Sequence, residues 1–365
     1  MGMLGDRGRR YPGSSRITRQ ASPDIAHGVG LPTGNAPGLG KRCPRVLHSG
    51  MLADTAPLAD DAEHIRQFHA VCRRDLAALS GLEKSRLRCS ALQLLLGGQV
   101  RRFADNMATF NVELVTRGLA EASVALCDRY GGRIVAEGLE HIPRSGPLLL
   151  VSNHPGMFDT LAIYATLPRS DIRALARPQP LLGLLSSLAP NLLMLPDEGA
   201  GRAGGLRQVL QLLRADGALL VFPAGHLEPE PYLVGHHGLN GASPDEPLGP
   251  WSSGVGTLVK LAARQGVPLR VVPTSIAGVL STRTWRWFGP LLKLRRTVRG
   301  REDLTAVLQL AFPGLSPTTI RVCYGAPLNA AALAAGDADV EGITARIRSV
   351  VGAQLRTHVP TRSRS

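Results

Sequence analysis

From about residue 133 onward, short apolar runs alternate with stretches of helical periodicity, and this alternation limits the possible folds more than any other feature of the chain. Strands are predicted at residues 133–136, 147–152, 172–176, 218–222, 269–274 and 319–323. Helices are predicted between them, at residues 158–167, 204–214 and 253–265. Strands and helices that alternate in this way are typical of α/β folds. We therefore predict an α/β domain with a mixed, largely parallel sheet flanked by helices.

The part of the chain before this alternation is organised differently. Residues 1–60 are rich in Gly, Pro, Ser and Arg and lack periodicity, so we expect a disordered tail. An over-long gene start, with Met51 as the initiator, is an open alternative. Residues 61–130 repeat apolar side chains at helical spacing, which predicts a helical N-terminal region that either packs on the main domain or faces a membrane. We expect the α/β domain to span residues 131–356 and residues 357–365 to form a basic, disordered tail.

Composition narrows the range of partners without choosing among them. The formal net charge of +14 favours an anionic partner, which is a nucleic acid, an anionic membrane surface or a phosphorylated substrate. The five cysteines are scattered and include no CxxC pair, so neither a zinc site nor a disulfide framework is predicted, and a reducing compartment fits best. No apolar run reaches the roughly 18 residues of a transmembrane helix, so we expect contact with a membrane to be peripheral.

The segment LLLVSNHPGMFDTLAIYATL, residues 148–167, carries the clearest chemical signal. An apolar strand ends at Ser152 and a helix begins near Phe158, so His154 is expected at the carboxyl end of a strand, where open α/β sheets bind ligands. Asp159, in the first helical turn, can reach back to one imidazole nitrogen and fix its tautomer. A His–Asp pair without an adjacent nucleophile favours general-base catalysis on a substrate hydroxyl. An ordinary turn histidine and a helix-start aspartate are the alternative.

The run NHPGMFD, residues 153–159, resembles the NHxxxxD signature of the glycerolipid acyltransferases, the family that includes 1-acylglycerol-3-phosphate acyltransferase. The resemblance implies that His154 is the general base and that Asp159 orients it. It also implies a glycerolipid acyltransferase-like fold and a thioester of coenzyme A or of acyl-carrier protein as the acyl donor. No metal or redox cofactor is expected.

Further blocks that resemble this family follow in the family's order and extend the likeness over roughly residues 130–330. Arg177 occupies the basic position that the family has after an early strand, which implies a substrate-binding role for its guanidinium. The blocks are ALARPQPL (174–181), LLVFPAGHLEP (219–229), PLRVVPTSIAG (268–278) and IRVCYGAPL (320–328).

The second of these blocks resembles the family's FPEGT motif with two changes. Phe222, Pro223 and Gly225 match the motif, and we expect this turn to bind substrate because glycine lets the backbone approach a ligand closely. Backbone N–H groups near Gly225 are expected to stabilise the oxyanion, with an ordinary strand-ending turn as the alternative. Ala224 stands where the family has Glu, and His226 stands where it has Thr. His226 is a further candidate for the site, with a loop histidine bonded to a nearby glutamate as the alternative.

The family's middle block, which carries an Arg directly after a short apolar strand, is also changed. Here the sequence LLMLPDEGAGR places Asp197 and Glu198 after the strand, and the first arginine is Arg202. Arg202 or Arg207 is expected to bind the substrate's phosphate if the loop folds back. The identity of the acceptor is therefore left more open than the type of reaction.

Residues 282–301, TRTWRWFGPLLKLRRTVRGR, interleave aromatic and basic side chains. Trp285 and Trp287 alternate with Arg283 and Arg286, a pattern that suits the headgroup zone of a lipid surface. Stacking on single-stranded nucleic acid and a buried Trp pair beside a solvated basic face are the alternatives.

We therefore predict an O-acyltransferase that moves a fatty-acyl group from acyl-CoA or acyl-carrier protein to a hydroxyl of a glycerolipid or lysophospholipid, in phospholipid biosynthesis or remodelling. The expected partners are the acyl donor, the lipid acceptor and an anionic membrane surface, with no nucleic acid. The expected location is cytoplasmic, on the inner face of the cell membrane. Two alternatives stay open: a thioesterase or hydrolase that uses the same His–Asp pair, and a non-catalytic lipid-binding protein at the membrane surface.

Overall fold

The computed structural model describes residues 58–80, 86–195, 200–233, 247–293, 297–336 and 338–358. Almost all of the two predicted tails lies outside these residues. The exceptions are residues 58–60, which belong to the first helix, and residues 357–358, which belong to the last. The domain boundaries expected from the sequence stay predictions.

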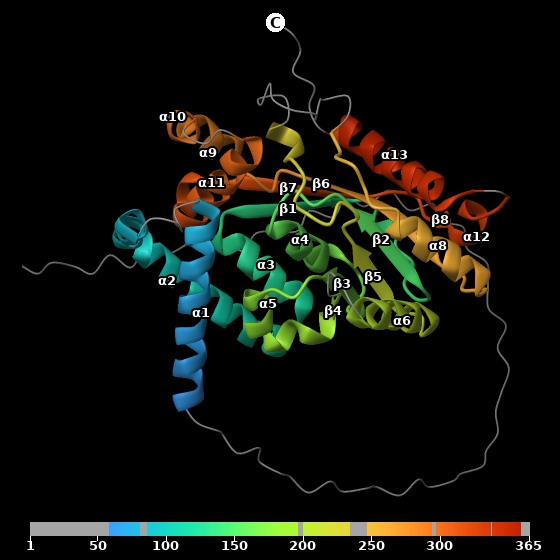
Figure 1. Ribbon diagram of the computed structural model, residues 1–365, viewed down its shortest axis with the longest axis horizontal. Helices are drawn as coiled ribbons and strands as arrows, with labels where there is room; N and C mark the ends of the chain where they lie inside the picture. Colours follow the sequence, from blue (N-terminus) through green and yellow to red (C-terminus); the bar gives the residue numbers. More distant parts are fainter. Residues whose placement is uncertain are drawn as a thin grey trace, which may run out of the picture.

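The described residues form an eight-stranded mixed sheet, and the predicted α/β class is confirmed (Figure 1). The strand order is β1-β7-β6-β2-β5-β3-β4, and β8 pairs with β6. The strands are β1 (Gly132–Glu137), β2 (Leu148–Ser152), β3 (Ile172–Ala176), β4 (Leu192–Met194), β5 (Ala218–Val221), β6 (Arg270–Ala277), β7 (Thr318–Tyr324) and β8 (Leu328–Asn329).

Most neighbouring strands are parallel, so the turns that follow them lie at the same edge of the sheet. Strand β2 runs parallel to both β5 and β6, and β3 runs parallel to β4 and β5. Only the β6–β7 and β6–β8 pairs of this sheet are antiparallel. The carboxyl ends of β2, β3, β5 and β6 therefore lie at one edge of the sheet, where open α/β sheets bind their ligands.

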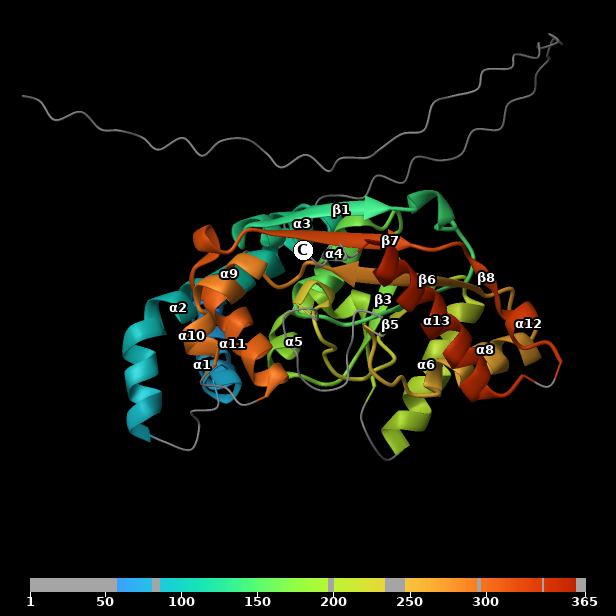
Figure 2. The ribbon, with the colours of Figure 1, turned by 90° about the horizontal axis from the view of Figure 1, so that it is seen from above.

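Helices cover both faces of the sheet, as Figures 1 and 2 show. Alternate residues of β2 explain this, since Leu148 and Leu150 are buried in one apolar cluster and Leu149 and Val151 in another. The first cluster contains side chains of α1 (Leu58–Ser80), α2 (Arg86–Thr116), α3 (Leu119–Arg129), α4 (Phe158–Thr166) and, at its margin, α5 (Pro180–Leu184). The second contains side chains of α6 (Ala200–Arg214), α8 (Gly254–Arg264), α12 (Ala330–Leu333) and α13 (Val340–His358).

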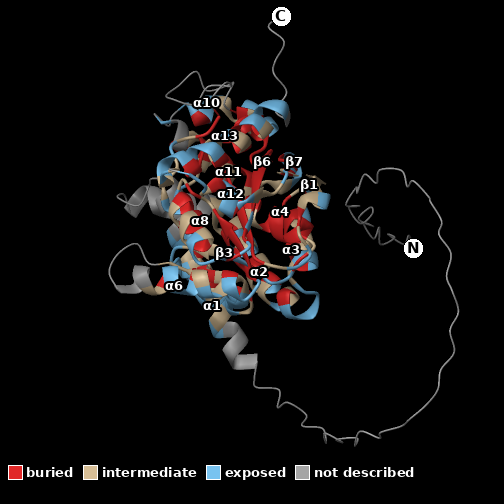
Figure 3. Ribbon diagram, turned by 90° about the vertical axis from the view of Figure 1, so that its right-hand side faces the viewer, coloured by how far each residue is buried: buried red, intermediate tan, exposed pale blue. Residues whose placement is uncertain are grey.

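The helical region before β1 is present as predicted from the sequence, in the form of α1, α2 and α3. Beyond β6 lies another group of helices, α9 (Thr282–Trp287), α10 (Gly289–Leu292) and α11 (Val298–Ala311). Helix α11 packs against both α1 and α2, so the two helical regions form one continuous layer. The central strands β2 and β5 are fully buried, whereas the outward helix faces are exposed (Figure 3). Within the described ranges, no helix is both long enough and apolar enough to cross a bilayer.

Candidate active site

The turn between β2 and α4 carries His154 at the predicted edge of the sheet. Asn153 holds the start of this turn, because its side-chain amide donates to the carbonyl of Ile276 at 2.8 Å and its carbonyl accepts from the Ile276 N–H at 2.8 Å. The Asn153 side chain thereby continues the β2–β6 pairing beyond Ser152. The Ser152 hydroxyl is buried and donates to the Asn153 carbonyl at 3.0 Å, so it is not presented as a nucleophile beside His154.

The structure brings His154 and Asp159 together. The distance from His154 Nδ1 to Asp159 Oδ2 is 2.7 Å, and the carboxylate is fully buried whereas the imidazole side chain keeps 26% of its surface exposed. The same Oδ2 accepts the Gly156 N–H at 3.1 Å, and Oδ1 accepts from the N–H and hydroxyl of Thr160. With Nδ1–H donating to the carboxylate, Nε2 is the nitrogen that can take up a proton.

The FPAGH turn after β5 lies directly against this histidine. The ring of Phe222 stacks on the imidazole of His154, with 4.2 Å between ring centroids and 19° between planes. Gly225 adopts a φ of 69°, a left-handed conformation that favours glycine. Its N–H donates to the Phe222 carbonyl at 3.1 Å, which closes the turn. The amide of Gly225 is thus used within the turn rather than aimed at a ligand.

Arg177 reaches the same turn from the end of β3. Its Nη2 atom lies 3.4 Å from the point that a Cβ atom would occupy on Gly225, and the residue is exposed. The structure therefore assembles His154, Asp159, Arg177, Phe222 and Gly225 from three neighbouring strand ends. Pro223 is buried in the turn, and its carbonyl accepts the Ser252 N–H at 3.0 Å.

The remaining candidates are less closely placed. His226 is exposed at the end of the FPAGH turn, and Arg207 is exposed on α6. The side chain of Arg202, and residues Asp197 and Glu198, lie outside the described residues. The roles expected for these arginines and for His226 stay predictions.

Two buried glutamates bind backbone groups of the segments around the site. Neither of them was assigned to the site from the sequence. Glu228 accepts the His154 N–H at 3.1 Å and the indole N–H of Trp251 at 3.0 Å. The only sequence signal for it is an acidic residue in the apolar, proline-rich stretch LEPEPYL, which does not reveal a partner 74 positions away.

Glu230, the second of these glutamates, organises the loop that follows β6. Its carboxylate accepts N–H groups of Gly278 at 2.7 Å, Val279 at 2.9 Å, Leu280 at 3.1 Å and Tyr232 at 3.2 Å. Val279 in turn packs on the turn that carries His154, because a Cβ atom on Gly156 would lie 2.8 Å from its Cγ1 atom. Gly156 is therefore required by close packing.

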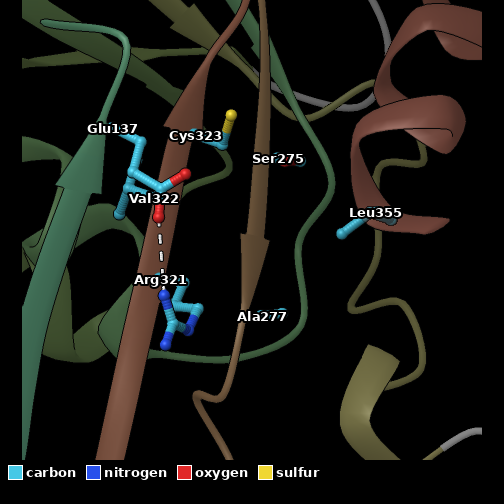
Figure 4. Close-up of a pocket in the computed structure, with 7 residues that line it drawn as sticks. All are labelled: Glu137, Ser275, Ala277, Arg321, Val322, Cys323 and Leu355. Atoms are coloured by element: carbon cyan, nitrogen blue, oxygen red, sulfur yellow. Dashed lines mark hydrogen bonds and ion pairs between the residues drawn. The ribbon is translucent and has the colours of Figure 1, made fainter. Parts of the chain in front are cut away.

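A pocket lies between β1, β7, β6 and α13 (Figure 4). Its lining includes the Glu137–Arg321 ion pair, at 3.4 Å, and Cys323. Burial raises the pKa of the Cys323 thiol to about 11, so the thiol is protonated at neutral pH and is not activated as a nucleophile. None of the predicted site residues lines this pocket. In the part of the chain that the structure describes, no group of three or more His, Cys, Asp or Glu side chains could hold a metal ion.

Comparison with known proteins found a match to the segment that contains His154, Asp159 and their neighbours. Residues 133–277 match the protein-family model described as Acyltransferase. This segment is therefore similar to the acyltransferase family. It contains the His154 turn, Arg177, the FPAGH turn and both buried glutamates.

One solved structure and the curated proteins complete the comparison. The crystal structure of the 1-acyl-sn-glycerophosphate (LPA) acyltransferase PlsC from Thermotoga maritima is similar to this chain with 15% sequence identity and a TM-score of 0.41. The match covers 84% of this chain and 99% of that one. No curated protein matches the chain.

The burial of Glu230 beside the loop after β6 predicts a pH-dependent stability. Burial, reinforced by nearby Glu302, raises the pKa of Glu230 to about 7 from 4.5, although its N–H donors act in the opposite direction. Between these two pH values the unfolded chain ionises this carboxyl first, so rising pH favours unfolding. As the pH rises from 4.5 through 7, we expect the free energy of unfolding of the wild type to fall by about 3 kcal/mol relative to that of Glu230→Gln.

Urea unfolding of both proteins across this pH range measures that difference directly. Because the two proteins share every other titrating group, the difference between their free energies of unfolding reports on Glu230 alone. A wild type that gains stability relative to the variant as the pH rises would contradict the raised pKa.

Proposed function

We propose that the protein transfers a fatty-acyl group from acyl-CoA or acyl-carrier protein to a hydroxyl of a glycerolipid or lysophospholipid. The observation that carries this proposal is the 2.7 Å His154–Asp159 contact within a segment of the acyltransferase family. The hydroxyl of Ser152 is buried and bonded to backbone, which favours a substrate hydroxyl as the nucleophile.

In the proposed reaction, Nε2 of His154 removes the proton from the acceptor hydroxyl as its oxygen attacks the thioester carbonyl. Asp159 keeps Nδ1 protonated and stabilises the imidazolium that forms. The tetrahedral intermediate then breaks its carbon–sulfur bond, and the leaving thiolate takes the proton back from His154. The atoms and protons exchanged in these reaction steps all come from the two substrates and the imidazole.

Arg177 is the best-placed cation for the negative charge of this reaction. Its guanidinium borders Gly225, whose own N–H is bonded within the turn, so we assign anion binding to the side chain rather than to that amide. The charge is either the developing oxyanion or a phosphate of donor or acceptor, since a guanidinium binds both through paired N–H donors.

We further propose that an anionic membrane surface presents the lipid acceptor, and that helices α9 and α10 contact it. Five exposed side chains form what we call the Trp–Arg patch: Arg283, Arg286, Trp287, Leu291 and Lys293. Trp287 keeps 54% of its surface exposed, and the Arg283 guanidinium lies 4.7 Å from the centre of its ring. Exposed aromatic and basic side chains together suit the headgroup zone of a bilayer.

The position of the Trp–Arg patch fits a role beside the site. Strand β6 ends at the same edge as β2, and α9 begins directly after the loop that packs on Gly156. Figures 1 and 2 both place α9 and α10 at one end of the molecule, far from α6. A lipid that leaves a surface at this patch would therefore enter at the sheet edge that carries His154.

Replacing the proposed base tests the reaction. We expect His154→Ala to lower kcat by about 10²- to 10⁴-fold, the usual contribution of general-base catalysis, and Asp159→Asn to lower it by about 10²-fold or more through loss of the correct tautomer. Turnover is measured with radiolabelled acyl-CoA or acyl-carrier protein and a panel of lysophosphatidic acid, glycerol 3-phosphate and neutral lysolipids.

A matched control for Asp159→Asn is Asp171→Asn, which removes a carboxylate that pairs with Arg169 at the opposite end of β3. It should keep nearly full activity. Wild-type-like turnover by a folded His154→Ala protein would contradict the general-base role.

Sedimentation with lipid vesicles tests the membrane proposal. We expect wild-type protein to bind phosphatidylglycerol vesicles more tightly than phosphatidylcholine vesicles, with an affinity that falls as salt is raised. Because each cation near an anionic surface contributes about 1 kcal/mol, the double variant Arg283→Glu/Arg286→Glu should bind at least about tenfold more weakly. Trp287→Ala should weaken binding at every salt concentration.

Leu206→Ala is the matched control, because Leu206 is also an exposed apolar side chain, 39% accessible, but lies on α6. It should bind as the wild type does. Equal binding by the Trp–Arg patch variants and the wild type would rule out this surface as the lipid contact.

A further inference from the structure

Glu228 contacts the backbone of the proposed general base from both sides. Its Oε2 atom accepts the His154 N–H at 3.1 Å, and its own N–H donates to the His154 carbonyl at 2.7 Å. A single residue thus binds both polar backbone groups of His154. Since these two groups flank the Cα atom, the contacts fix the direction in which the imidazole leaves the chain.

The second carboxylate oxygen of Glu228 connects Glu228 and His154 to the segment at 249–252. Oε1 of Glu228 accepts the indole N–H of Trp251 at 3.0 Å, and a backbone hydrogen bond from Gly249 reaches the same carboxylate. The segment around Trp251 also binds the FPAGH turn, through the hydrogen bond from Ser252 N–H to the Pro223 carbonyl. Glu228 therefore links the turn that carries the base, the turn that carries Phe222 and Gly225, and the segment at 249–252.

A carboxylate in this position is not explained by packing alone. Glu228 is only 2% exposed, and burial raises its pKa while the hydrogen bonds from Trp251, His154 and Gly249 lower it. An apolar side chain of similar volume would avoid the cost of desolvation. It would also leave the N–H of His154 and of Trp251 without their acceptor, which is costly in a buried site.

We propose that Glu228 is a positioning residue that holds His154 at a fixed distance from the turn bearing Phe222 and Gly225. The inference rests on the acyl-transfer function proposed above. The distance matters because the base must reach the acceptor hydroxyl while the group that stabilises the oxyanion reaches the thioester carbonyl. Small displacements of such groups are enough to lower turnover by about 10²-fold. Because Glu228 holds the backbone of His154 rather than a substrate, its loss should change kcat and leave substrate binding intact.

The test combines kinetics with a direct view of the contact. In the whole chain, Glu228→Gln keeps the shape of the side chain but has one acceptor oxygen, which cannot serve both the His154 N–H on one side and the N–H groups of Trp251 and Gly249 on the other. We expect kcat to fall by about 10- to 100-fold while KM for donor and acceptor stays within about twofold. In spectra of protein labelled with ¹⁵N-histidine, the His154 amide, assigned by its loss in His154→Ala, should shift upfield and exchange faster.

Two control variants separate positioning from a general loss of stability. Asp171→Asn removes a carboxylate that pairs with Arg169 just before β3, outside the site. Glu113→Gln disturbs a carboxylate that pairs with Arg117 and Arg129 on the far helical layer. Both should keep kcat within about threefold of the wild type, and both should leave the His154 amide unmoved.

Each outcome decides the matter. A shifted amide together with a selective fall in kcat supports the proposal. An unmoved amide overturns it, and so does a shifted amide with unchanged kcat or an equal fall in kcat in the two control variants. A wild-type protein that is inactive with every donor and acceptor contradicts the acyl-transfer function itself, and that failure is recognised because it does not depend on any substitution.

Discussion

The contact between His154 Nδ1 and the Asp159 carboxylate is the interaction on which the proposed chemistry depends. It requires a fully buried carboxylate, and the turn supplies the remaining hydrogen-bond donors from Gly156 and Thr160. The contact also requires a fixed backbone at His154, and two side chains fix it through hydrogen bonds. Asn153 extends the pairing of β2 with β6, and Glu228 binds His154 from the other side. The imidazole is thereby oriented from the sheet and from a separate turn at once.

The parallel strands explain why residues so distant in sequence meet at this place. His154 follows β2, Arg177 follows β3 and Phe222 follows β5, and these strands are neighbours in one sheet. A parallel arrangement places their carboxyl ends at a common edge. Helices α9 and α10 follow β6, which ends at the same edge of the sheet as the strand before His154. The architecture thus places the proposed base, a cation and the proposed lipid-facing surface on segments that follow neighbouring strands.

The parts of this arrangement that follow from local pattern could be predicted from the sequence. The apolar run before Ser152 and the NHPGMFD turn together indicated a strand end with a His–Asp pair, and the contact between the two side chains is present. Strand β8 was missed because a segment of two residues is too short to show periodicity, and β4, of three residues, was indicated only through the resemblance of LLMLPDEGAGR to the family's middle block. Glu228 was missed as a partner of His154 for a different reason: its contacts depend on how two turns pack, and no sequence spacing encodes that.

The central claim is that the His–Asp pair directs an acyl group to a lipid hydroxyl rather than to water. The most direct measurement supplies wild-type protein with a thioester labelled in its acyl chain, on coenzyme A or on acyl-carrier protein, and raises the concentration of lysophosphatidic acid. Mass spectrometry then follows the label in acylated lipid and in free fatty acid. We predict that the label enters the lipid in proportion to the acceptor and that little fatty acid is released. Release of fatty acid at a rate independent of the acceptor would contradict the account and identify a thioesterase.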